Sequence, residues 1–301
     1  MTSQADATVE PATAPAALSP LRVFYWSVKR ELWEHGSVWI APLAVAAVAL
    51  LGFAFGAVSL AHVMRAGATF NGDATKIIAV PYEFVAAAVF LTGFLVAVFY
   101  CLGAMHNERR DRSILYWKSL PVSDLTSVLA KATVPLIVIP PILFVVIVGA
   151  QLIVLALSTL IALATGLDPN VLWAHTPILD IWLDLARGLP ILALWYAPLY
   201  GWLLLVSAWA RRAPFLWAVV PPLALALLER LALGTSYVGS WLRLRLIGPF
   251  AASMAHAKAP LGHATALDPT GWTSPHLWIG IVLAAAFLAL AVRLRRSSDP
   301  I

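Results

Sequence analysis

Long runs of apolar residues alternate with short polar stretches along almost the whole chain. Six of these runs approach the length of about 20 residues that a helix needs to cross the hydrocarbon core of a bilayer. None of them shows the two-residue alternation of a membrane β-strand. The pattern therefore predicts transmembrane helices over residues 38–61, 82–105, 133–163, 189–210, 213–233 and 277–294.

The stretch before the first run is amphipathic rather than uniformly apolar. Between Leu21 and Glu34, apolar side chains recur at helical spacing, and the basic residues lie away from that face. This is the pattern of a helix that lies in the membrane interface. We therefore predict an interfacial helix over residues 20–36.

Composition places the chain among membrane proteins. Hydrophobic residues make up 61% of the 301 residues and charged residues 12%, whereas soluble domains carry about 25% charge. The single cysteine, Cys101, excludes a disulfide framework within one chain. In such a chain the net charge of +5 reports membrane topology, and we expect no nucleic-acid partner.

The basic residues are distributed unevenly between the two sides of the predicted spans. Thirteen Lys and Arg residues lie on the side that holds both chain ends, and six lie on the other side. The positive-inside rule therefore puts both termini and the loop at 106–132 in the cytoplasm. Residues 1–19 are expected to be a disordered tail because they are rich in Ala, Thr, Pro and Ser. Residues 37–296 would form the transmembrane domain, and residues 297–301 a second tail.

The loop at 106–132 is the densest run of charge in the chain. Residues 108–118 are predicted to form a short helix that Pro121 ends. Ser123 or Asp124 then caps a second helix that runs into the third span. Two helices, a proline break and a cap are more structure than a flexible connector needs. This loop is therefore a candidate docking element.

Charge of both signs and apolar bulk occur together in this loop. Mixed signs favour a protein partner, whereas a purely basic loop would favour lipid headgroups. The apolar side chains would supply the centre of an interface. The residues expected to contact the partner are Glu108, Arg109, Asp111, Arg112, Ile114, Trp117 and Lys118. Which face of the helix docks stays open, since Arg109 and Arg110 could instead meet lipid headgroups.

Two segments on the opposite side are longer than a turn requires. Residues 177–188 are amphipathic, with Asp184 and Arg187 spaced to pair, and are expected to form an interfacial helix. Residues 234–276 contain an apolar stretch that its arginines, glycine and proline make too polar and broken to span. A re-entrant or interfacial helical pair before the last span is the better interpretation.

Four further residues are candidates for roles within the membrane. Gly52 and Gly56 form a small-xxx-small pair, which lets another helix approach closely and suggests a dimer contact. Glu229 and Arg230 lie at the outer end of the fifth span, where charge suggests a substrate path. Snorkelling of Arg230 to the interface is the alternative interpretation.

Several motifs of enzymes are absent from the sequence. There is no glycine-rich phosphate-binding loop followed by Lys and Ser or Thr, so the chain shows no nucleotide-hydrolysis site of its own. The sequence also lacks H-E-x-x-H and G-x-S-x-G, and its histidines show no metal-ligand spacing. We therefore predict no catalytic, cofactor-binding or metal-binding residues in this chain.

The loop and the six-span layout together resemble a known family. The residues that carry the resemblance are Glu108-Arg109-Arg110-Asp111-Arg112-Ser113, then Trp117-Lys118-Ser119-Leu120-Pro121-Val122-Ser123, with Lys131 before the third span. This pattern is similar to that of the permease subunit of ATP-binding-cassette (ABC) transporters of the type-2 exporter family. The likeness in layout covers nearly the whole chain.

The resemblance implies an all-α, multi-pass protein of the bacterial cytoplasmic membrane, with six transmembrane helices. The loop would be the coupling helix between spans 2 and 3, docked into a cleft of a separate cytoplasmic ATPase subunit that binds ATP and Mg. A second permease copy, identical or different, would complete the translocation path within the membrane lipid. The family does not specify the substrate, and the apolar path favours a hydrophobic or amphipathic one.

Two other functions remain open from the sequence. A membrane-embedded enzyme would need outer residues such as Asp180, Asp184 and His256 to converge in one cavity. A secondary transporter usually shows internal repeats and polar or broken helices at the midplane. The sequence shows neither a clear repeat nor midplane charge.

Overall fold

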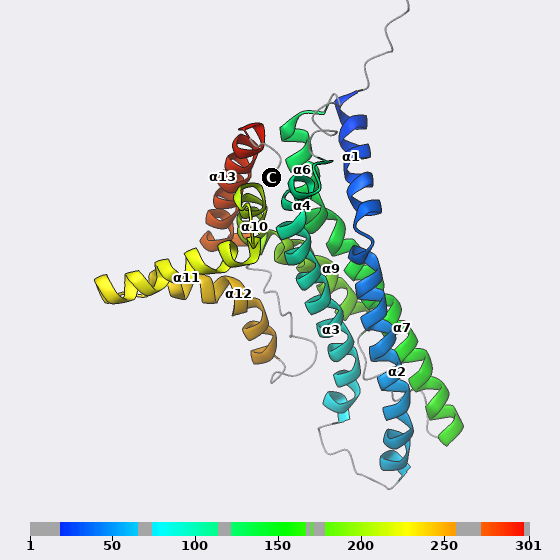
Figure 1. Ribbon diagram of the computed structural model, residues 1–301. Coiled ribbons are helices and arrows are strands. Elements are labelled where there is room, and N and C mark those ends of the chain that lie inside the picture. The colour runs from blue at the N-terminus through cyan, green and yellow to red at the C-terminus, as the bar shows by residue number, and fades with distance from the viewer. Residues whose placement is uncertain are drawn as a thin grey trace, which may run out of the picture.

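The computed structural model describes residues 19–65, 74–113, 122–166, 170, 178–256 and 272–297 (Figure 1). Within these ranges the regular structure is helical and contains no strand. Five helices are long and apolar enough to cross a membrane, and one bent pair would supply a sixth span. The chain is therefore a helical membrane protein.

The first helices lie where the apolar pattern places them. Helix α1 (Pro20–Glu34) begins at a cap in which the Ser19 hydroxyl accepts a hydrogen bond from the backbone of Arg22. After a turn at 35–36 the chain enters α2 (Ser37–Arg65), and α3 (Ala74–Gly103) follows. The structure confirms a helix over the predicted interfacial segment, although the predicted tail falls almost wholly outside the described residues.

The loop between the second and third spans differs from its prediction. Helix α4 (His106–Arg110) is a single turn that ends before Asp111, and Arg112 has a positive φ of 57°. The predicted helix over residues 108–118 is therefore interrupted in its described part, since residues 108–110 are helical and the chain turns at Asp111 and Arg112. A side chain with positive φ cannot continue a right-handed helix. Residues 114–121 lie outside the described ranges.

The third span begins at the predicted cap. The Ser123 hydroxyl accepts a hydrogen bond from the backbone of Thr126 and starts α6 (Asp124–Thr133). A π-helical turn, η1 (Val134–Val138), joins α6 to α7 (Ile139–Thr165). Pro135 in η1 lacks an N–H group, which favours such a widened turn.

The fourth predicted span is broken. Helix α9 (Ile178–Trp195) and helix α10 (Ala197–Trp209) meet at an angle of 43°. The interfacial helix predicted over 177–188 is not separate, because α9 runs on through Pro190. The break lies at Tyr196 instead, where Pro198 in the first turn of α10 offers no N–H to the preceding turn. The predicted pair of Asp184 and Arg187 is confirmed, at 4.0 Å.

The next two helices form a hairpin that projects from the rest of the molecule (Figure 1). Helix α11 (Pro214–Leu233) ends at Gly234, whose φ of 66° reverses the chain into α12 (Tyr237–His256). In the described part of residues 234–276 the main element is one helix, α12, which contains Pro249 within its length. Residues 257–271 lie outside the described ranges, so the predicted re-entrant or interfacial pair stays a prediction. Helix α13 (Pro275–Ser297) completes the fold.

The core lies between α2, α3 and α7 and between α10 and α13. At Gly93, an added Cβ would lie 2.6 Å from Leu143 Cδ1, so this glycine lets α3 and α7 approach closely. Gly52 and Gly56 are exposed, and an added Cβ at either would meet no atom within 4 Å. A dimer contact there stays a prediction.

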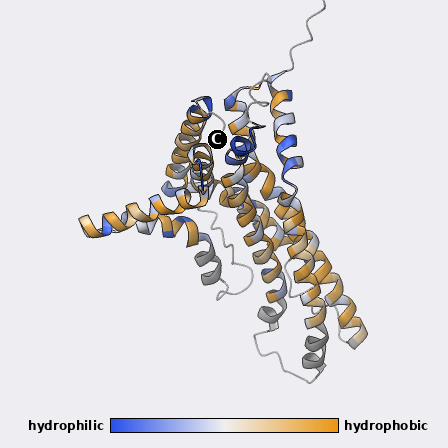
Figure 2. Cartoon of the chain, viewed as in Figure 1, coloured by the Kyte–Doolittle hydropathy of each residue, from blue (hydrophilic) through white to orange (hydrophobic). Residues whose placement is uncertain are grey.

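Hydrophilic residues gather at one end of the helical bundle (Figure 2). Helices α1, α4 and α6 and the C-terminal end of α13 meet at this end (Figure 1). The apolar lengths of α2, α3 and α7 extend away from it. The fold thus brings charged residues from distant parts of the sequence together at the base of the 106–132 loop.

Candidate functional site

Six charged side chains from four helices form one cluster, which we call the ionic node. Three are acidic and three are basic, so their formal charges cancel. The members are Arg30 and Glu31 on α1, Glu108 on α4, Asp124 and Lys131 on α6, and Arg295 on α13.

Glu108 is the centre of the node because its carboxylate meets bases from three other helices. One oxygen lies 2.9 Å from Lys131 Nζ and 3.2 Å from Arg30 Nη2. The other oxygen accepts from Arg295 Nη1 at 2.7 Å. Single-residue contacts thus connect the turn at α4 to α1, α6 and α13.

Glu31 forms the second acidic site of the node. Lys131 Nζ donates to its Oε1 at 2.8 Å, and Arg30 Nη2 donates to the same oxygen at 3.0 Å. The Tyr100 hydroxyl on α3 donates to Oε2 at 2.9 Å. Lys131 therefore bridges two carboxylates that lie 77 positions apart in the sequence, Glu31 and Glu108.

Four of the six members of the node are buried, and Arg30 and Asp124 are half-buried, so the balance of charge matters for its stability. Lys131 is 1% exposed, Glu31 2% and Arg295 4%. Removing an ion from water costs several kcal/mol, and attraction offsets that cost only when the geometry is close and the remaining hydrogen bonds are made. Each buried acid here has at least two partners, so the node holds the four helices in one arrangement.

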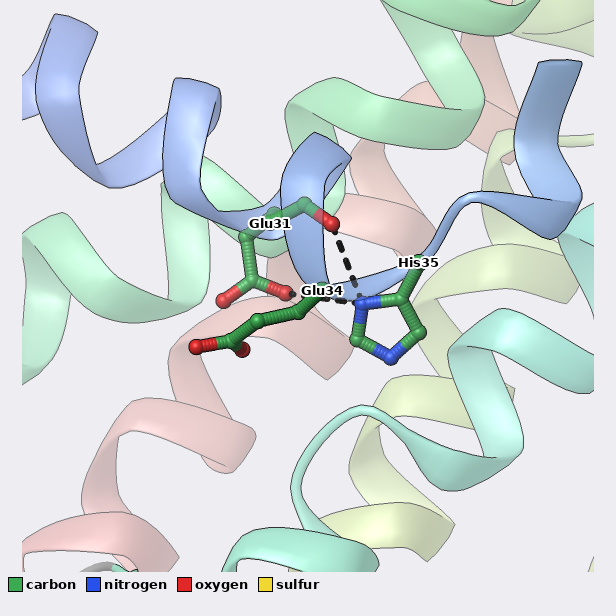
Figure 3. Close-up of side chains that lie close together, drawn as sticks. All are labelled: Glu31, Glu34 and His35. Atoms are coloured by element: carbon green, nitrogen blue, oxygen red, sulfur yellow. Dashed lines mark hydrogen bonds and ion pairs between the residues drawn. The ribbon is translucent and has the colours of Figure 1, made fainter.

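Glu31 also belongs to a group of three potential metal ligands, with Glu34 and His35 (Figure 3). Their ligand atoms all lie within 4.8 Å of one another. His35 Nδ1, however, lies 3.1 Å from the Glu31 carbonyl oxygen, so it must carry the proton and cannot bind a metal through that atom. Glu34 pairs with Arg30 at 3.1 Å, and the Glu31 carboxylate already pairs with Lys131. This arrangement fits an ion-pair network better than a metal site.

A second set of contacts fixes α4 on the end of α10. The Ser207 hydroxyl accepts from the backbone N–H groups of Met105 and His106, at 3.0 and 2.9 Å. Arg109 donates to the carbonyls of Ser207 and Ala210, at 2.7 and 2.8 Å. A cation at the C-terminal carbonyls of a helix also meets the negative end of the helix dipole. The base of the loop is therefore bonded to α10 as well.

The residues expected to contact a protein partner differ in their exposure. Glu108 and Arg109 are buried and bonded within the chain, so neither presents its charge at the surface. Asp111 and Arg112 are exposed. The other three expected contacts, Ile114, Trp117 and Lys118, lie outside the described residues.

Sequence reasoning missed the buried partners of Glu108. Arg295 counted only as one of the basic residues that report topology, Lys131 also as part of the family resemblance, and Glu31 was not singled out. One signal was available for Glu31, since it lies three residues after Val28 and therefore on the apolar face of the predicted interfacial helix. An acid on an apolar face requires a partner when that face is buried.

Glu229 has a local structural role in the hairpin. Its carboxylate accepts from the Thr235 hydroxyl at 2.8 Å and from the backbone N–H groups of Tyr237 and Val238 at 2.6 and 2.7 Å. These are the first amides of α12, so Glu229 caps that helix from α11. Its use in a substrate path, with the exposed Arg230, is not needed to explain it.

Replacing Glu229 with glutamine should loosen the start of α12, because the amide group has one acceptor oxygen where the carboxylate has two. We expect faster hydrogen exchange at the amides of Tyr237 and Val238. Arg230→Gln, one residue along, is the matched control and should leave that exchange unchanged. Unchanged exchange in Glu229→Gln, together with reduced transport, would favour the substrate-path interpretation instead.

The acidic residues considered for an enzyme do not form a site with a histidine in the described part of the chain. Asp180 is exposed on α9, and Asp184 pairs with Arg187. The side chain of His256 is not among those the structure describes. These contacts give no support to an enzyme centred on Asp180 and Asp184.

Comparison with known proteins gives no match to a family model, to a curated protein or to a solved structure. The functional argument therefore rests on the residues and their contacts.

Proposed function

We propose that the chain is the membrane-spanning permease subunit of an ATP-driven ABC exporter of the type-2 family. A separate cytoplasmic ATPase would bind ATP and Mg, and a second permease copy would complete the path. The cargo would be hydrophobic or amphipathic, as the apolar spans favour. The complex would lie in a bacterial cytoplasmic membrane with both termini of this chain inside.

The observation that carries the proposal is the rigid base of the loop. Glu108 joins α4 to α1, α6 and α13, and Arg109 joins α4 to α10. A force on the loop would therefore reach several helices at once. A permease needs such a connection, because the energy of ATP binding is released outside the membrane.

The same contacts extend the path expected from the sequence. That path ran from the loop into the second and third spans. Bonds from α4 to Ser207 and Ala210 add α10, and the pair of Glu108 with Arg295 adds α13. In the proposed mechanism, closure of the ATPase subunits moves α4, and α10 and α13 move with it.

Asp111 and Arg112 are the test of docking, because both are exposed in the described part of the loop. The tagged chain should co-purify with a cytoplasmic ATPase that has a phosphate-binding loop. Asp111→Ala and Arg112→Ala should each weaken that association roughly 30-fold or more, since losing one partner of a charge pair buried at an interface costs about 2–5 kcal/mol.

Arg187→Ala is the control for this experiment, because Arg187 is also exposed but lies on α9, in the segment expected on the outer side. It should leave the association unchanged. If both loop variants bind the ATPase normally and retain transport-coupled hydrolysis, the docking proposal is wrong. If no such ATPase co-purifies with the unmodified chain, the permease proposal itself fails.

A further inference from the structure

The break between α9 and α10 is held from outside by an arginine of α12. Arg245 Nη1 donates to the carbonyl of Trp195, the last residue of α9, at 2.7 Å. Its Nη2 donates to the carbonyl of His276 at the start of α13. One guanidinium thus connects the end of one half-span to the beginning of the last span.

The contacts at this break are reciprocal. The Trp195 indole N–H donates to the Arg245 carbonyl at 3.3 Å, and the guanidinium lies 4.5 Å from the centre of the Trp195 ring. The Tyr196 hydroxyl donates to the carbonyl of Leu246 at 3.5 Å. Both residues at the bend, Trp195 and Tyr196, are therefore bonded to α12.

Arg245 is a costly residue to place here. It is 3% exposed, and burial lowers the pKa of its guanidinium. Its Nε has no hydrogen-bond partner among the described residues, and no acid there pairs with it. A buried charge without a counter-ion is retained only where its bonds are useful. In this structure those bonds go to the two helix ends.

Gly280 on α13 makes room for this arginine. An added Cβ at Gly280 would lie 2.7 Å from Arg245 Cζ, and such a contact requires the guanidinium to move. The space is thus specific to the present position of Arg245. It also provides a way to displace the arginine without removing its charge.

The opposite side of the break faces a small apolar cavity. Tyr196 and Tyr200 line it together with Phe94 of α3 and Pro135 of η1. A bend that borders a cavity has fewer packed neighbours to resist a change of angle. The π turn at η1 is on the same cavity wall.

We infer that the break at Tyr196 is a hinge and that Arg245 is the latch that holds its present angle. At the other end of α10, Arg109 bonds the last carbonyls to the loop. Helix α10 is then a lever with its hinge at one end and α4 at the other. The hinge is inferred from contacts within this chain. Only its role in transport rests on the proposed function.

Hydrogen exchange of the purified full chain in lipid nanodiscs tests the latch, with no ATPase present. Arg245→Met should raise the exchange rate of the amides at 193–201 roughly tenfold, since the hydrogen bond from the charged guanidinium to the Trp195 carbonyl is lost. Gly280→Ala should have the same effect by displacing the arginine. Agreement of two variants on different helices would show that the position of the guanidinium matters.

Two matched variants complete the experiment. Arg243→Met removes an exposed arginine from the same helix, and Gly149→Ala adds a methyl group where no atom lies within 4 Å. Both should leave exchange at 193–201 unchanged. The latch is refuted if Arg245→Met and Gly280→Ala also leave it unchanged. A rise of equal size throughout α2 and α3 would refute it too, because Arg245 would then support the whole fold rather than one hinge.

Discussion

Replacing Glu108 with glutamine should lower the free energy of unfolding by about 3–5 kcal/mol, because removing one charge of a buried ion pair leaves its partner unpaired. The variant keeps the shape of the side chain but leaves Lys131, Arg295 and Arg30 with one carboxylate fewer. The first two bases are almost fully buried and cannot regain water without opening the fold. The melting temperature of the purified chain in detergent should therefore fall by several degrees.

Asp111→Asn is the matched control for this loss of charge. Asp111 lies three residues along, and its side chain is 59% exposed, so the melting temperature should barely change. Equal effects of the two variants would contradict the central role of Glu108.

A double-mutant cycle identifies the partner of Glu108. Glu108→Gln combined with Arg295→Gln should cost less than the sum of the two single changes, because the double variant restores the balance of charge. Additive costs would mean that the 2.7 Å contact contributes no coupling of its own.

The helices could be predicted from the sequence because burial in lipid requires long apolar runs. The cap at Ser123 could be predicted as well, since a side-chain acceptor three residues before Thr126 acts locally. The ionic node could not. Glu31, Lys131 and Arg295 come from positions 31, 131 and 295, and no local rule brings them together.

The break in the fourth span shows where local rules are insufficient. Pro190 and Pro198 both remove a backbone donor, yet α9 continues through Pro190 and breaks before Pro198. Among the residues that the structure describes, a side chain from another helix, Arg245, binds a carbonyl at the second site, that of Trp195. A contact from a distant helix thus accompanies the break before Pro198, and the sequence alone does not show it.

The loop illustrates the same limit for function. Its charges suggested a surface, and two of its members, Glu108 and Arg109, are instead buried. Their burial changes the interpretation of the loop from a set of docking side chains to a docking tip on a fixed base. Variants at the base and at the tip should therefore fail in different ways, the first in stability and coupling and the second in association.

Arg109→Met should separate these two outcomes most clearly. Methionine fills much of the same volume but donates neither of the hydrogen bonds to Ser207 and Ala210, at 2.7 and 2.8 Å. Hydrogen bonds to a charged group contribute about 1.5–3 kcal/mol each. The repulsion from Arg211 disappears at the same time and offsets part of the loss. We expect a net loss of about 2–3 kcal/mol, and faster hydrogen exchange in the last turn of α10.

Arg110→Met is the control, because the neighbouring arginine is 64% exposed and its contact is with Asp111 at the surface. It should leave both stability and exchange in α10 unchanged. In the proposed complex with an ATPase, Arg109→Met should still bind that subunit, since Asp111 and Arg112 are intact, while transport per ATP hydrolysed should fall. Loss of ATPase binding with α10 exchange unchanged would instead show that Arg109 is a docking residue, and that α4 does not act through α10.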